Sequence, residues 1–278
     1  MSFIEAVLYG ILQGVTEFLP VSSSGHLALA QKIFGSAASP DQRMAFDVFL
    51  HLATLLSVTL VYRKDVACLV RGAFSLLFRS VSSQRRKKEL DFGERLTLCT
   101  LVANLPMGIA LVLKDKIESV SSSLVAVGVC LVINAFVLRI SDVLGRRNKK
   151  ISEMTPKNAL TVGFFQACAV LPGISRSGAT VTGMLWQDFE RPDAVRFSFL
   201  MSIPTVLVAG IIEMPAIACG VGIGWEVLVT GAVCAAISGV ASIKLLSLIS
   251  KKSDFRVFSY YCAIIGAAAV IFRAVNGG

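Results

Sequence analysis

Two stretches of this 278-residue chain place ionisable and hydroxyl side chains inside otherwise apolar sequence. The first reads GILQGVTEFLPVSSSGHL at 10–27, and the second reads GFFQACAVLPGISRSGAT at 163–180. A carboxylate, an imidazole, a guanidinium and several hydroxyl groups are side chains that bind anions and activate nucleophiles. Because such groups are costly in an apolar setting, their concentration at two breaks in apolar runs predicts a functional site.

The first stretch carries a candidate acid–base pair. Gln13 and Glu17 are four residues apart, so a helix presents them side by side on one face. His26 follows the SSSG run, and we expect it to return close enough to Glu17 to share a proton, because a buried carboxylate needs a partner. A purely structural contact between the two is the alternative. Asp47 and His51 repeat the four-residue spacing, and we interpret them as structural or merely supportive.

The serines at the two breaks are suited to anion binding. Ser22, Ser23 and Ser175 each precede a returning helix, in positions typical of N-caps. Two helix N-termini that converge present free N–H groups and positive dipole ends to one point. Arg176 adds a planar fork that matches phosphate oxygens. Since an unpaired arginine at membrane depth is expensive, a bound anion or Glu17 must compensate it, and a purely structural pair with Glu17 is the alternative.

Composition indicates an all-α polytopic membrane protein. Hydrophobic residues make up 55% of the chain and charged residues only 16%, against about a quarter in soluble domains. Six apolar stretches approach the roughly 20 residues that a span requires. They are approximately 44–62, 96–114, 120–140, 194–213, 225–247 and 256–274.

Each of the two polar stretches separates two short helices, so neither region is predicted to be a continuous span. Residues 3–18 and 22–34 are separated by Pro20 and the serine run, and 159–171 and 177–187 by a Pro-Gly pair. We interpret both pairs as re-entrant hairpins, whose irregular backbone must line a cavity or lie within protein.

The hairpins also belong to an internal repeat. A shift of 153 positions superposes five identical residues, namely Gly10 on Gly163, Gln13 on Gln166, Ser22 on Ser175, Ser24 on Ser177 and Gly25 on Gly178. Three predicted spans separate the hairpins, and this odd number predicts opposite orientations, with the two breaks meeting near the midplane. We therefore divide a single membrane domain, 1–278, into repeats of approximately 1–118 and 155–278.

The charge distribution predicts the orientation. Nine Lys and Arg residues fall in 63–95, six in 139–157, two in 191–196 and three in 251–256, while the opposite side receives five. The positive-inside rule makes the first set cytoplasmic. The net charge of +9 thus reflects topology, and no nucleic-acid role is expected. Residues 64–79 are predicted to form a helix on the inner membrane surface.

Both stretches resemble motifs of a known family. Gln13 with GVTEFLPVSSSGHL resembles the (E/Q)xxxE motif and its serine-rich extension, and LPGISRSGAT resembles the PGxSRSxxT motif, of undecaprenyl-diphosphate phosphatases. This resemblance covers nearly the whole chain. It implies an enzyme of the bacterial inner membrane that removes the terminal phosphate of undecaprenyl diphosphate from a pocket open to the periplasm, recycling the cell-wall lipid carrier and conferring bacitracin resistance.

The resemblance also implies roles for particular residues. For catalysis these are Glu17, His26, Ser23, Ser22 and Arg176, and for substrate binding they are Ser175, Ser177 and Thr180. We add Gln13 and Ser24 to the substrate-binding residues from their positions in the first stretch. Many relatives carry Glu where this chain has Gln13, which argues against Gln13 as an obligatory base or metal ligand. The nucleophile stays open between Ser23, Ser22, His26 and water.

Cofactors, partners and alternatives complete the expectations. Because there is no dedicated carboxylate cage, Mg²⁺ or Ca²⁺ would be held partly by substrate oxygens, and no protein ligand or organic cofactor is assigned. The expected partners are a polyprenyl diphosphate, the membrane and a possible second copy.

Type 2 phosphatidic acid phosphatases share superficial SSGH and SR segments, but the histidine they need would fall at Thr182. A secondary transporter or lipid flippase is the alternative from another class.

Overall fold

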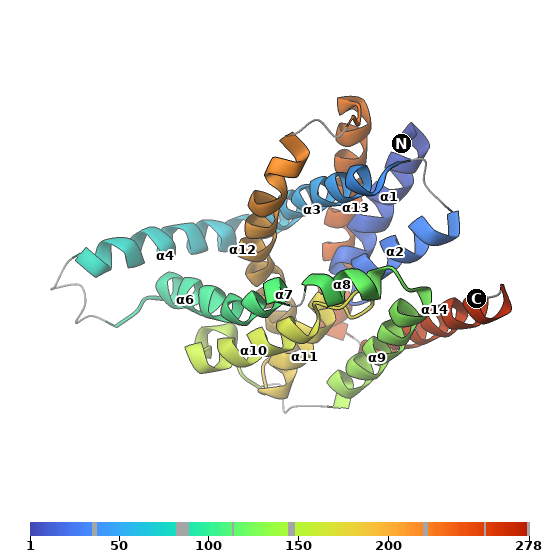
Figure 1. Ribbon diagram of the computed structural model, residues 1–278. Coiled ribbons are helices and arrows are strands. Elements are labelled where there is room, and N and C mark those ends of the chain that lie inside the picture. The colour runs from blue at the N-terminus through green and yellow to red at the C-terminus, as the bar shows by residue number, and fades with distance from the viewer. Residues whose placement is uncertain are drawn as a thin grey trace.

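The structure is a computed structural model that describes residues 1–34, 38–81, 89–112, 114–143, 148–218, 222–252 and 254–276. In these ranges the regular structure is helical, apart from one isolated bridge between Lys149 and Phe189, so the all-α prediction is confirmed (Figure 1). The helices are α1 Phe3–Phe18, α2 Ser23–Phe34, α3 Pro40–Val61, α4 Arg63–Val81, α6 Phe92–Asn104, η1 Leu105–Gly108, α7 Ile109–Val112, α8 Lys114–Ser121, α9 Leu124–Val143, η2 Ile151–Glu153, α10 Pro156–Cys168, α11 Arg176–Trp186, α12 Arg191–Ala218, α13 Trp225–Lys252 and α14 Arg256–Val275.

The two broken helical pairs form as the sequence predicts. The pair α1 and α2 is interrupted before Ser23, and α10 and α11 are interrupted before Arg176. Pro20 stops α1 because proline cannot continue a helix. Ser22 then takes a positive φ of 73° and Gly173 one of 105°, so that each chain turns sharply into its second helix.

Five helices in the described ranges are long and apolar enough to cross a membrane. They are Gln42–Val61, Leu124–Val143, Arg191–Ile212, Trp225–Lys251 and Arg256–Val275. The predicted span at 96–114 is wrong as a continuous helix: α6 ends at Asn104 and the chain continues as η1 and α7. Pro106 explains the interruption, because it lacks an N–H and clashes with the carbonyl one turn earlier.

The first helices of the two hairpins pack in the same way. A Cβ on Gly10 of α1 would lie 2.4 Å from the carbonyl oxygen of Gly231 in α13. A Cβ on Gly163 of α10 would lie 2.4 Å from the carbonyl oxygen of Ala103 in α6. These two glycines are equivalent under the 153-residue shift. Small residues let helix backbones approach this closely, which is a common packing mode in membranes.

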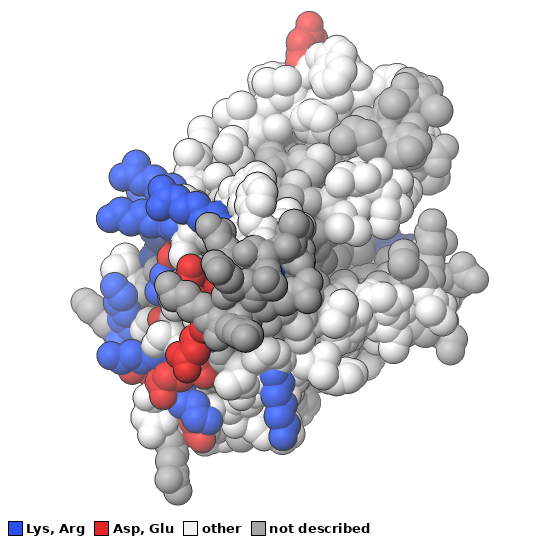
Figure 2. Space-filling model, turned by 90° about the vertical axis from the view of Figure 1, so that its left-hand side faces the viewer, with Lys and Arg blue, Asp and Glu red and all other residues white. Residues whose placement is uncertain are grey.

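Positive charge gathers at one end of the molecule. In Figure 1, α4 continues from α3 and projects to the left; Figure 2 looks at that end, where Lys and Arg side chains, with Asp and Glu among them, gather on the left-hand part of the view. The predicted helix at 64–79 is confirmed as α4, and it exposes Val70, Phe74, Leu77 and Phe78. Its position on a membrane surface stays a prediction.

Candidate active site

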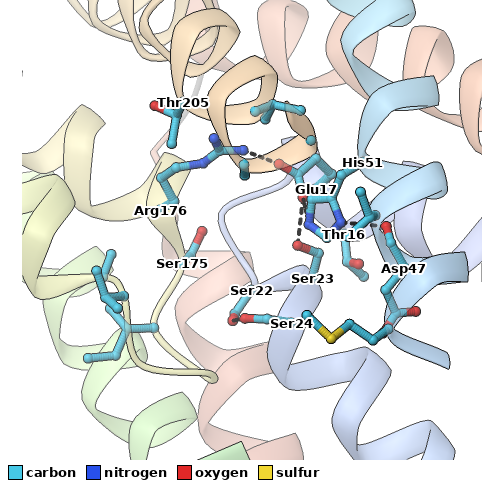
Figure 3. A pocket seen from close by; sticks show the side chains of 18 of the residues that line it. Thr16, Glu17, Ser22, Ser23, Ser24, Asp47, His51, Ser175, Arg176 and Thr205 are labelled. Carbon is cyan, nitrogen blue, oxygen red and sulfur yellow. Dashed lines mark hydrogen bonds and ion pairs between the residues drawn. The ribbon is translucent and has the colours of Figure 1, made fainter. Parts of the chain in front are cut away.

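A cavity of about 570 Å³ lies where the two helical breaks face α3 and α12 (Figure 3). Polar side chains from all four regions line it, and apolar side chains such as Met44, Val48 and Val206 complete its wall. The polar lining includes Glu17, Ser22, Ser23, Ser24, Asp47, His51, Ser175, Arg176 and Thr205. Most of the residues singled out in the sequence therefore meet at one cavity.

The carboxylate of Glu17 is the centre of this arrangement. Its Oε1 forms an ion pair with Nη2 of Arg176. Its Oε2 accepts hydrogen bonds from Ser23 Oγ at 2.7 Å and Gln13 Nε2 at 3.1 Å, and lies 3.5 Å from His51 Nε2. The side chain of Glu17 is only 5% exposed, so these donors replace the solvent that a carboxylate requires. The positive charge of Arg176 is compensated by Glu17, one of the two expected solutions.

His51 approaches Glu17, which the sequence analysis did not foresee. Its Nδ1 lies 2.8 Å from the carbonyl oxygen of Asp47. Because a carbonyl only accepts, Nδ1 carries a proton and donates it, which leaves Nε2 turned toward Glu17. The Asp47 carboxylate accepts from Gln31 Nε2 at 3.2 Å. The four-residue spacing of Asp47 and His51 was the available signal, but it did not show which surface of the span the pair faces.

His26 does not share a proton with Glu17, so that prediction is wrong. The imidazole of His26 lies 2.8 Å from the Ser22 carbonyl oxygen through Nδ1 and 2.9 Å from the Tyr261 hydroxyl through Nε2. The two rings also stack, with centroids 5.5 Å apart. The Ser22 carbonyl and Tyr261 of α14 thus hold the ring outside the cavity lining. There the imidazole stabilises the break between α1 and α2.

The two breaks are in direct contact, which confirms that their tips meet. Ser22 Oγ accepts the backbone N–H of Gly173 at 3.1 Å. The same oxygen accepts the N–H of Gly25 at 3.3 Å, and Ser175 Oγ accepts that of Gly178 at 3.1 Å. Ser22 and Ser175 are therefore N-caps of α2 and α11, as predicted. The Ser23 hydroxyl instead donates to Glu17.

Asn134 in α9 joins the two breaks and was missed by the sequence analysis. Its Nδ2 donates to the Pro20 carbonyl at 3.0 Å, and its Oδ1 accepts the Ser175 N–H at 3.0 Å. The residue is fully buried. A single asparagine in an apolar span was the only signal, and it did not identify either partner. One side chain thus provides hydrogen-bond partners for a backbone group from each break. Neither group is paired within a helix, because both lie where the helices are interrupted.

The residues assigned to substrate binding divide into two groups. Ser24 and Ser175 line the cavity. Gln13, Ser177 and Thr180 are buried behind its lining. Gln13 donates to Glu17, and the hydroxyls of Ser177 and Thr180 make hydrogen bonds within the protein. These three residues support the wall without touching the cavity.

The described residues contain no group of three or more His, Cys, Asp or Glu side chains that could hold a metal ion. The two carboxylates of the cavity, Glu17 and Asp47, already accept hydrogen bonds from protein donors.

Together the fold and the cavity define a class: a multi-pass membrane protein whose broken helices bring an arginine, a carboxylate and serines to one cavity. Residues 6–268 match the family described as bacitracin resistance protein BacA. The chain belongs to this family, and the resemblance of its motifs is confirmed.

Curated relatives extend over nearly the whole chain. A protein named undecaprenyl-diphosphatase from Halothermothrix orenii is 37% identical, over 99% of this chain and 100% of its own. Proteins of the same name from Methanosphaera stadtmanae and Bacteroides fragilis are 36% and 35% identical, with 99% and 98% of both chains covered. The similarity therefore includes both breaks and the helices that surround the cavity.

Proposed function

We propose that this chain is a membrane phosphatase that hydrolyses undecaprenyl diphosphate to undecaprenyl phosphate and inorganic phosphate. The observation that carries the proposal is the contact of Glu17 with both Ser23 and Arg176 at the edge of the cavity. A base, a hydroxyl nucleophile and a guanidinium fork are the groups that phosphoryl transfer requires. The family and the names of the relatives support the same reaction.

The diphosphate would bind between the two breaks. Arg176 pairs with Glu17 through one nitrogen, and its other N–H groups are available to phosphate oxygens. The N-termini of α2 and α11 add partial positive charge at the same point. The apolar wall beside them fits the first units of a prenyl chain. Binding and charge stabilisation thus come from fixed groups of the protein.

We assign the nucleophile to Ser23. Its hydroxyl donates to Glu17 Oε2 at 2.7 Å, so the carboxylate is placed to take the proton as Oγ attacks the terminal phosphorus. The phosphoanhydride bond breaks, undecaprenyl phosphate leaves, and a phosphoserine remains. Water then hydrolyses this ester, and the proton held by Glu17 returns to Ser23. His51 Nε2, 3.5 Å from Oε2, can exchange that proton with the cavity. Ser22 instead accepts two backbone N–H groups.

The decisive assay uses purified protein in detergent with undecaprenyl diphosphate. Phosphate release needs no sealed membrane, whereas the activity of a transporter or flippase does. Ser23→Ala should lose nearly all phosphate release yet keep substrate binding and stability. Ser23→Ala is the sharper test because Glu17→Gln also leaves Arg176 without its partner. Wild-type turnover by Ser23→Ala would exclude this nucleophile, and absence of release by folded wild-type protein would exclude the phosphatase.

We further propose that the protein lies in the bacterial inner membrane. Its basic end would then face the cytoplasm, and its cavity would open to the periplasm. The cavity contacts the first half of α3, while the basic α4 follows the other end of that helix. A cysteine replacing exposed Asn148, in a background without native cysteines, should react with an impermeant thiol reagent only in opened cells. One replacing Gly222 should react in intact spheroplasts. The reverse pattern would invert the topology.

The repeat and the accessory ligands belong to the same proposal. The equivalent contacts of Gly10 and Gly163 support inverted repeats of approximately 1–118 and 155–278. Mg²⁺ or Ca²⁺, held partly by diphosphate oxygens, would neutralise phosphate charge. Removing metal with a chelator and restoring it should then lower and recover substrate affinity. A homodimer stays a prediction that sedimentation in detergent can test.

A further inference from the structure

A second cavity, of about 490 Å³, lies at the basic end of the molecule. It is formed by the junction of α3 and α4, the start of α12 and the end of α13. It shares no lining residue with the active-site cavity. On α3, His51 lines the first cavity and Val61 the second, which places these Cα atoms about 15 Å apart along the helix. The two cavities are separate sites.

One face of α13 supplies the polar side of this second cavity. Lys244, Ser247, Leu248 and Lys251 all line it, and their spacing of three, four and seven residues places them in one stripe. Both lysines are exposed. Within the described part of the chain, neither ammonium group has a carboxylate within 4.0 Å or a hydrogen-bond partner. Lys244 also lies inside the apolar span Trp225–Lys251, where an uncompensated charge is expensive.

The other charged residues of the cavity are already engaged. Arg196 donates through Nε to Asp65 Oδ2 at 3.0 Å, and the two side chains form an ion pair. Asp193 accepts the backbone N–H of Ile151 at 2.7 Å. The two lysines of α13 therefore give the cavity a net positive charge, because the one carboxylate among its lining residues, Asp193, cannot neutralise both of them together with Arg196. An anionic ligand is complementary to this surface.

We propose that the second cavity binds an anionic phospholipid of the leaflet at the basic end, with its phosphate between Lys244 and Lys251. The hydroxyls of Tyr62 and Ser247, 3.1 Å apart, offer a further donor. The volume lies in the range of roughly 300–1,000 Å³ typical of small-ligand pockets. Apolar lining from Val61, Pro192 and Leu248 suits the start of an acyl chain. Basic pockets between membrane helices are known to bind lipid head groups.

The test measures binding directly and does not depend on the hydrolytic reaction. Full-length protein in neutral detergent is titrated with phosphatidylglycerol or with phosphatidylcholine, and bound lipid is counted by native mass spectrometry. Wild-type protein should prefer phosphatidylglycerol. Lys244→Gln/Lys251→Gln should bind it about 25-fold more weakly, since each lysine near an anionic lipid contributes about fivefold. Phosphatase activity of this variant should be unchanged.

Two matched variants control for unspecific effects. Lys64→Gln/Lys157→Gln removes two exposed charges that do not line the cavity, and it should keep the preference. Lys244→Arg/Lys251→Arg keeps both charges and should keep it as well. Unchanged binding by the glutamine variant, or an equal loss in either control, would overturn the proposal. If wild-type protein binds undecaprenyl phosphate more tightly than phosphatidylglycerol, and the two glutamine substitutions weaken that binding, the assignment to a phospholipid is overturned.

Discussion

Replacing Asn134 by Leu should destabilise the protein strongly, although the change keeps the size of the side chain. In the structure this fully buried amide donates to the Pro20 carbonyl and accepts the Ser175 N–H, both at 3.0 Å. The leucine leaves both backbone groups buried without these partners. The Ser175 N–H loses its acceptor, which costs about 1–3 kcal/mol, while the Pro20 carbonyl keeps only a weak contact with Cys262 Sγ at 4.0 Å, so the free energy of unfolding should fall by about 2–5 kcal/mol.

The same variant should impair hydrolysis, because Pro20 and Ser175 belong to the two breaks that carry the catalytic groups. Asn134→Asp should also destabilise, because it keeps an acceptor for the Ser175 N–H but buries a carboxylate oxygen against the Pro20 carbonyl. The assay is denaturant unfolding in detergent, paired with phosphate release on the same preparations. Asn276→Leu, at an exposed helix end, is the matched control and should change stability by less than about 0.5 kcal/mol. An Asn134→Leu protein as stable as this control would refute the bridging role.

Three further changes test other parts of the structure. Arg176→Lys keeps the charge but loses the fork, so phosphate release should fall roughly 10²-fold; near-normal turnover in folded protein would reduce the side chain to a counter-charge. Gly14→Ala places a Cβ 2.1 Å from Ser238 Oγ and should destabilise by about 1–3 kcal/mol, whereas Gly108→Ala meets nothing within 4 Å and should be neutral in the same melts. Asp142→Ala removes the carboxylate that pairs with Arg191 at 2.7 Å and accepts the backbone N–H of Phe255, and it should lower the free energy of unfolding by about 1–3 kcal/mol; an unchanged unfolding curve would show that this carboxylate is dispensable.

Local sequence determined the helical elements and the place of the site. Apolar runs interrupted by Leu-Pro and Pro-Gly predicted both broken helical pairs, because proline and glycine act on the backbone within a few residues of their own position. Serines at helix starts predicted the caps that Ser22 and Ser175 form. Pro106 is a local signal of the same kind: it interrupts the apolar run that predicts a continuous span at 96–114, and α6 ends at Asn104.

Only the tertiary structure decided which polar groups meet. Glu17 contacts His51 from α3 and Arg176 from α11, while His26 from the adjacent helix is held by Tyr261 of α14. Spacing along a helix fixes which residues share a face, but the direction of that face depends on how helices distant in sequence pack against one another. The bridge formed by Asn134 has the same origin, because its two backbone partners become neighbours only when the breaks meet. The sequence thus determines which side chains can do the chemistry, and the packing of the helices decides which of them share the cavity.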